Sequence, residues 1–114
     1  MSNRSVGAGG EDAVAAWYEE HGYRVVARNW RAGRAGELDL IARRGRTLVF
    51  CEVKTRSSLA FGAPAEAVGR QKQLRIRRLA AQWLREARPG PADRLRFDVA
   101  SVLGGRIEVV EGCF

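Results

Sequence analysis

Three ionisable side chains interrupt two otherwise apolar segments within residues 36–56, which read GELDLIARRGRTLVFCEVKTR. Asp39 lies in the first segment, and Glu52 and Lys54 lie two residues apart in the second. Burying a charge is costly unless the charge is paired or binds a metal ion. These three residues are therefore the first candidates for chemistry in this chain.

The two segments predict a β-hairpin whose two-residue turn is Arg44 and Gly45. This register makes Asp39 and Glu52 diagonal neighbours, roughly 7–8 Å apart at the backbone and within reach of a common ion. Because side chains alternate between the faces of a strand, one face would carry Glu37, Asp39, Glu52 and Lys54. The opposite face would carry Leu38, Leu40, Val49, Cys51 and Val53.

Two interpretations of the ionisable face stay open. In the first, Lys54 forms a salt bridge with one acid and the group is structural. In the second, a divalent cation relieves the repulsion between the carboxylates. Carboxylate ligands without nearby His or Cys indicate Mg²⁺ or Mn²⁺. Such an ion can bind a phosphate and activate a water molecule, while Lys54 orients that water or neutralises charge that develops on the phosphate.

Helices and further strands must position this hairpin. The helices are predicted over residues 10–21 and 64–88, with Glu11 and Ala65 as alternative first residues. The predicted strands are residues 23–29, 37–43, 46–55, 95–103 and 106–110.

The element order α-β-β-β-α-β-β predicts an α/β fold with a mixed central sheet flanked by helices. A long helix between two strands of one sheet indicates a right-handed crossover, so strands 46–55 and 95–103 should be parallel. The hairpin itself should be antiparallel. A length of 114 residues is enough for one domain. We predict a loose tail over residues 1–9 and a single domain over residues 10–114.

The charge balance favours a polyanionic partner. The formal net charge is +7, and Lys54 and Lys72 are the only lysines among 20 basic residues. Such an excess is typical of proteins that bind nucleic acid, although arginine on every surface is the plain alternative. Cys51 and Cys113 have no spacing that suggests zinc or a disulfide framework. With no signal-like or membrane-spanning apolar run, we expect a cytoplasmic protein without a membrane partner.

The pattern of Asp39 followed by Glu52-x-Lys54 on the next strand resembles the motif of the PD-(D/E)XK nuclease superfamily. A longer match resembles the YraN family of small bacterial proteins and covers nearly the whole chain. The matching segments are GELDLIA (36–42), LVFCEVKTR (48–56), FGAPAEAV (61–68), the helix over 72–83 and RFDVASV (96–102), with GxxGE from Gly7 and ARNW from Ala27.

The resemblance implies a restriction-endonuclease-like fold, similar to that of archaeal Holliday-junction resolvases, which are dimeric Mg²⁺-dependent endonucleases. By position, Asp39 and Glu52 would be metal ligands and Lys54 the catalytic lysine. Glu11 matches the helix glutamate that completes such metal sites, and Gln71 resembles a polar residue on the following helix of some nucleases. A homodimer and no small-molecule cofactor are implied in the same way.

Residues around this site are candidates for phosphate contact, with a solvated surface as the alternative for each. They are Arg31, Arg34, Thr55, Arg56, Lys72 and Arg75. Glu37 either supports the site or pairs with Arg34 or Arg56. Trp30 is expected to serve core or dimer packing, with base stacking as the alternative.

Three functions compete on this evidence. The first is a Mg²⁺-dependent endonuclease that hydrolyses phosphodiesters in structured or branched DNA. The second is a nucleic-acid-binding module of DNA repair or recombination that does not cut. The third is a scaffold whose basic surface binds an acidic protein.

Overall fold

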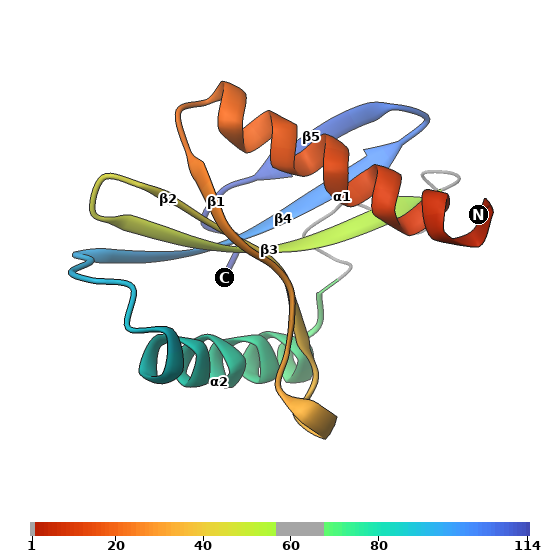
Figure 1. Ribbon diagram of the computed structural model, residues 1–114. Coiled ribbons are helices and arrows are strands. Elements are labelled where there is room, and N and C mark those ends of the chain that lie inside the picture. The colour runs from red at the N-terminus through yellow and green to blue at the C-terminus, as the bar shows by residue number, and fades with distance from the viewer. Residues whose placement is uncertain (1, 57–67) are drawn as a thin grey trace.

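A five-stranded mixed sheet lies between two helices in the computed structural model, which describes residues 2–56 and 68–114 (Figure 1). The helices are α1 (Ser2–Glu20) and α2 (Arg70–Ala87), and a short 3₁₀ turn, η1, spans Gly33–Ala35. The strands are β1 (Arg24–Arg31), β2 (Glu37–Arg44), β3 (Thr47–Arg56), β4 (Arg94–Leu103) and β5 (Arg106–Val110). The predicted fold class and the order α-β-β-β-α-β-β are confirmed.

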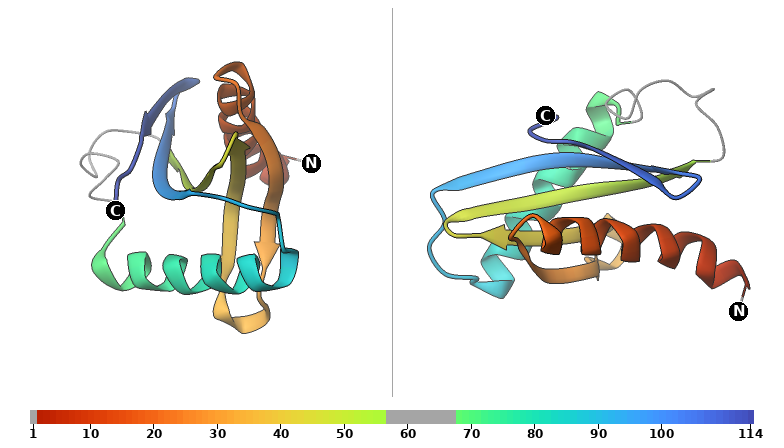
Figure 2. Two further views of the ribbon diagram at one scale, coloured as in Figure 1. Left: turned by 90° about the vertical axis from the view of Figure 1, so that its left-hand side faces the viewer. Right: turned by 90° about the horizontal axis from the view of Figure 1, so that it is seen from above.

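The strands follow one another in the sheet as β1-β2-β3-β4-β5. β3 and β4 are parallel, while each of the other neighbouring pairs is antiparallel. The parallel pair is the one that α2 connects, as the crossover argument predicts. Both views in Figure 2 place α1 on one face of the twisted sheet and α2 on the other.

Each face of the sheet has its own apolar cluster, which agrees with a sheet covered on both sides. Buried residues on the α2 face include Ile41, Leu48, Phe50, Ile76, Leu79, Trp83, Phe97 and Val99. Buried residues on the α1 face include Val14, Tyr18, Leu40, Ala42, Val49, Cys51, Ala100 and Val102. Trp30 packs against the α2 cluster, which supports the core interpretation of this residue.

The hairpin between β2 and β3 turns one residue later than predicted, at Gly45 and Arg46. The predicted register paired Leu40 with Val49, whereas the structure pairs Leu40 with Cys51. Gly45 has a φ of 59°, a conformation that glycine adopts readily, so it takes the first turn position. A shift of two residues preserves the facing of every side chain, because strand alternation has a period of two.

Leu38 is an exception to the predicted facing. It was expected with Leu40 and Val49, but it packs with the α2 cluster. Figure 1 shows the η1 end of β1 and β2 bending past α2. This bend brings the start of β2 against α2. The side chain of Leu38 therefore does not follow the simple alternation of faces along the strand.

The first helix begins at Ser2, eight residues before Gly10, so the segment predicted as a loose tail is helical from residue 2. The glycines of this segment had suggested a break. Gly10 is instead buried against the Oγ1 atom of Thr55, where a Cβ atom would collide. The glycine therefore serves the close approach of α1 to β3.

The second helix begins later than predicted. Its N-cap is Gly69, and Val68 is also outside the helix, so α2 starts at Arg70 and not at Pro64 or Ala65. The predicted first residues lie outside the part of the chain that the structure describes. The end is close to the prediction, with Arg88 as a left-handed C-cap.

A buried polar network connects α1, β4 and the chain after β5. Asp98 is fully buried, and its carboxylate accepts hydrogen bonds from Tyr18 Oη at 2.6 Å and Gly112 N at 3.0 Å. The Nε and Nη2 atoms of Arg96 each donate to it at 2.9 Å. Asp98 therefore pairs with an arginine, and its role is to hold the fold.

Within the described residues, neither helix is both long and apolar enough to cross a membrane. Both cysteines are free, with Cys51 buried in the sheet.

Candidate active site

The predicted acidic residues meet in a hollow of about 230 Å³ between the β2–β3 hairpin and α2. It is lined by Gly36, Glu37, Asp39, Glu52, Lys72, Arg75, Ile76 and Leu79. The strands supply the carboxylates, and α2 supplies the basic and apolar walls. The hairpin thus brings Asp39 and Glu52 together as predicted.

Asp39 is partly buried and held by the neighbouring strand. One of its carboxylate oxygens accepts a hydrogen bond from the backbone N of Val53 at 2.9 Å. Burial and the negative charge of Glu52 raise the pKa of Asp39 to about 7, although the Val53 bond lowers it. Two carboxylates in a poorly hydrated hollow therefore repel each other enough to keep Asp39 partly protonated near neutral pH.

Glu52 is neutralised by two lysines that contact the same oxygen. Its Oε2 atom lies 2.5 Å from Lys72 Nζ and 3.3 Å from Lys54 Nζ. The Glu52 side chain is only 10% exposed, so these contacts compensate a carboxylate with little access to water. The predicted salt bridge of Lys54 is therefore made with the acid on β3, and Asp39 has no basic partner at salt-bridge distance among the described residues.

The two lysines respond differently to the same carboxylate. Burial lowers the pKa of Lys54, and the adjacent ammonium of Lys72 lowers it further. Burial also lowers the pKa of Lys72, but its contact with the Glu52 carboxylate outweighs this and the net shift of its pKa is upward. Lys72 is thus the firm ion-pair partner of Glu52, and Lys54 is the more easily released amine.

The sequence did not predict the contact of Lys72 with Glu52, because Lys72 was expected to contact phosphate. The amino-acid composition nevertheless contains a signal for this contact. The chain uses arginine at nearly every basic position, and its only two lysines both meet Glu52. An ammonium group is a compact charge that fits beside another ammonium on one oxygen more readily than a planar guanidinium does.

Glu11 and Glu37 lie at the margins of the hollow. Glu37 lines it but also lies 3.7 Å from Arg31, so its partner among the described side chains is Arg31 and not Arg34. The charge of Glu11 helps to raise the pKa of Asp39 across the sheet. Glu11 is not among the residues that line the hollow.

The predicted phosphate contacts divide into three groups. Arg34 and Thr55 are exposed, and Arg31 is exposed but paired with Glu37. Arg56 ends β3, and its side chain lies outside what the structure describes. Lys72 and Arg75 line the hollow itself, whereas Gln71 is exposed on α2 and does not.

The donor set fits a hard divalent cation better than a transition metal. Asp39 and Glu52 offer oxygen ligands from adjacent strands, and their mutual repulsion is what a cation would relieve. Among the described residues, no three His, Cys, Asp or Glu side chains form a ready metal-binding group. The fit is therefore to an ion such as Mg²⁺, which uses one or two carboxylates and keeps several water ligands.

Fold and site together define a class of protein: a small α/β domain in which Asp39, Glu52 and Lys54 of the central hairpin lie near Lys72 of α2. The model of uncharacterised protein family UPF0102 matches residues 10–102, and the chain belongs to this family, which is the YraN family that the motifs resemble.

Relatives resemble the chain over most of its length. A UPF0102 protein of Beutenbergia cavernae is 57% identical over 102 residues, which cover 90% of this chain and 85% of the relative. One of Nocardia farcinica is 55% identical over 88% of this chain and 77% of its own. One of Acidothermus cellulolyticus is 41% identical over 99% of this chain and 96% of its own.

Proposed function

We propose that this protein is a metal-dependent endonuclease of the Holliday-junction-resolvase-like type, which hydrolyses phosphodiesters in structured or branched DNA. The observation that carries the proposal is a hollow lined by Asp39, Glu52 and Lys72, with Lys54 in contact with the same Glu52 oxygen. Burial, together with the negative charge of Glu52, raises the pKa of Asp39 in this hollow. Perturbed acids in a cleft are typical of functional sites.

Each residue at this site has a defined role in the proposal. Asp39 and Glu52 would hold Mg²⁺ or Mn²⁺, which when bound supplies Lewis acidity and an activated water. The Val53 N–H fixes the Asp39 carboxylate in the hollow. Lys54, the more easily released amine, would turn its ammonium from Glu52 toward the phosphate and stabilise the charge that develops there. Lys72 would keep Glu52 in position during this change.

Cleavage assays with matched variants test the proposal. Labelled four-way junction, flap, duplex and single-stranded DNA are incubated with Mg²⁺ or Mn²⁺. We expect Asp39→Asn, Glu52→Gln and Lys54→Met each to lower the cleavage rate at least ~100-fold, because each removes a group that acts on the reacting phosphate. Glu108→Gln is the control, since this glutamate is exposed on β5. Equal cleavage by the parent and all three site variants contradicts the proposal.

Metal binding can be measured without activity. An ion that binds only the folded chain raises its melting temperature. We expect Mn²⁺ to raise the Tm of the parent and of Glu108→Gln, and to leave the Tm of Asp39→Asn unchanged. Equal shifts in all three proteins would place the ion elsewhere.

A non-cutting nucleic-acid-binding module is the second candidate, and one observation favours it. Lys54 and Lys72 both contact the Glu52 carboxylate, as they would in a structural ion pair. This candidate predicts DNA binding that weakens with salt and yields no product with either ion.

A further inference from the structure

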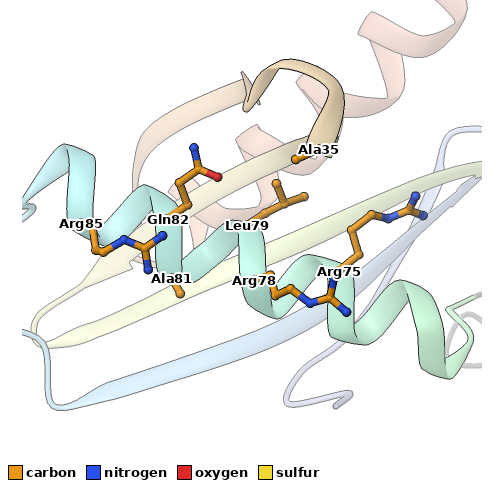
Figure 3. Close-up of a pocket in the computed structure, with 7 residues that line it drawn as sticks. All are labelled: Ala35, Arg75, Arg78, Leu79, Ala81, Gln82 and Arg85. Atoms are coloured by element: carbon orange, nitrogen blue, oxygen red, sulfur yellow. The ribbon is translucent and has the colours of Figure 1, made fainter.

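A second hollow, of about 360 Å³, lies along α2 and is lined in part by three arginine side chains (Figure 3). It is lined by Ala35, Arg75, Arg78, Leu79, Ala81, Gln82 and Arg85. Ala35 belongs to η1, so the groove lies between the helix and the bent end of β1 and β2. Arg75 and Leu79 also line the acidic hollow. The two spaces are therefore neighbours that share a wall.

The three arginines form a row that is oriented toward the acidic hollow. Arg75, Arg78 and Arg85 span ten residues of α2, which is about 15 Å along a helix. In Figure 3 their side chains extend from the helix toward its N-terminal end. Helical side chains lean in that direction generally. That end of α2 carries Lys72, which contacts Glu52.

The charge of this row is not compensated locally. α2 contains six basic residues and one acidic residue, Glu86, a net charge of +5 within a chain of +7. Glu86 accepts a hydrogen bond from Gln82. Among the described residues, none of the three arginines has a carboxylate at salt-bridge distance. All three are exposed, so the row attracts a polyanion at little desolvation cost.

The shape of the two spaces favours an unpaired strand. The carboxylates of the acidic hollow are recessed, and the Glu52 side chain is 10% exposed. A phosphate within an intact duplex stays on the outside of that duplex, whereas a phosphate of an unpaired strand can enter a recess. Among the described residues, none that lines the groove is aromatic, so its contacts would be to the backbone and independent of sequence.

We propose that the groove between α2 and η1 binds the sugar-phosphate backbone of a single DNA strand and leads it to Asp39 and Glu52. This inference rests on the proposed function, because the strand is led to the proposed nuclease site. It narrows the substrate to DNA with an unpaired segment, such as a flap. Arg78 and Arg85 are strand-binding residues that lie outside the acidic hollow, and Arg75 is the link between the two spaces.

The test is a fluorescence anisotropy titration of a labelled single strand of about 12 thymidines, with EDTA present so that binding is separated from cleavage. The variant is Arg78→Gln/Arg85→Gln. The control is Arg24→Gln/Arg106→Gln, which removes the same charge from exposed positions of β1 and β5. Titrations are repeated between about 50 and 200 mM salt. Circular dichroism confirms that each variant is folded.

We expect the groove variant to bind the strand at least ~10-fold more weakly than the control variant. Its slope of log K against log salt should fall by about 1.4 in magnitude, which corresponds to two lost phosphate contacts on a single strand. A duplex of the same length should bind more weakly than the single strand and respond little to the groove variant. Equal loss in both double variants, or tighter binding of the duplex, overturns the proposal.

The outcome separates this inference from the nuclease itself. Strand binding that depends on Arg78 and Arg85, without any cleavage in Mg²⁺ or Mn²⁺, supports the groove and contradicts the nuclease. Cleavage that needs Asp39, with strand binding unaffected by the groove variant, supports the nuclease and overturns the groove.

Discussion

Asp39 and Glu52 are both carboxylic acids, but their surroundings give them different charge states. Glu52 has two ammonium groups on one oxygen. Asp39 has one backbone N–H and a negative neighbour, which together with burial give it a pKa of about 7. Where a metal ion is absent, Asp39 is therefore the residue whose protonation changes near neutral pH.

This difference predicts how stability depends on pH. The Asp39 carboxyl has a pKa of about 7 when folded and 3.8 as its ordinary value, so between these values the folded chain binds more protons than the unfolded one. The free energy of unfolding in EDTA should then fall as pH rises from about 4 to about 7. Urea titrations across this range should show a smaller fall for Asp39→Asn. A parent and variant with parallel pH profiles would show that Asp39 titrates normally.

Much of the site could be predicted at the residue scale. The face on which a strand residue lies depends only on whether its position along the strand is odd or even. The shared face of Asp39, Glu52 and Lys54 was correct although the turn was one residue out of place. Contacts from a distant helix could not be predicted, since hairpin pairing contains no information about where α2 packs. Lys72 therefore emerged as a partner of Glu52 only in the structure.

At the scale of elements, the contact between α1 and β3 decides how the helix approaches the site. Glycine within a helix usually costs about 1 kcal/mol relative to alanine. At Gly10 we expect the opposite effect, with alanine less stable than glycine, because a Cβ atom would collide with Thr55 Oγ1. We expect Gly10→Ala to lower the free energy of unfolding by about 1–3 kcal/mol.

The neighbouring glycine provides the control for this prediction. A Cβ atom at Gly9 meets nothing within 4 Å, so Gly9→Ala should be neutral or stabilising. Adding Thr55→Ala to Gly10→Ala should restore much of the lost stability, as measured by chemical denaturation. Equal effects of alanine at both glycines would mean that helix propensity alone governs this segment.

The start of the first helix was misplaced. Residues 1–9 were predicted as a loose tail, whereas α1 begins at Ser2 and includes Gly10 within it. Strand positions were easier to predict, because β-branched and apolar runs bounded by glycine turns are local signals. The bounds of β5 agree with the prediction, and its turn is Gly104 and Gly105.

At the scale of the whole molecule, the network around Asp98 joins parts of the chain that are far apart in sequence. Tyr18 reaches it from α1, Arg96 from its own strand, and Gly112 from the segment after β5. Burial raises the pKa of Tyr18, so its hydroxyl remains a donor to the carboxylate. The network therefore holds both ends of the chain to the sheet.

Removal of this carboxylate should be costly. Asp98→Ala leaves the buried guanidinium of Arg96 without its main partner, and breaking a buried ion pair costs about 3–5 kcal/mol. We expect a corresponding loss in the free energy of unfolding, measured by urea titration. Asp93→Ala is the control, because its ion pair with Arg46 is exposed and should contribute at most about 1 kcal/mol. Similar losses in both variants would contradict the role of burial.

The meeting of both lysines at one carboxylate has a practical consequence for chemical labelling. Because Lys54 and Lys72 are the only lysines in the chain, reagents that acylate primary amines have no other side-chain amine as a target. The lowered pKa of Lys54 and the raised pKa of Lys72 favour reaction at the former. A single fluorophore or crosslinker could thus be attached beside Glu52 in the unaltered sequence, where it would report directly on what enters the hollow.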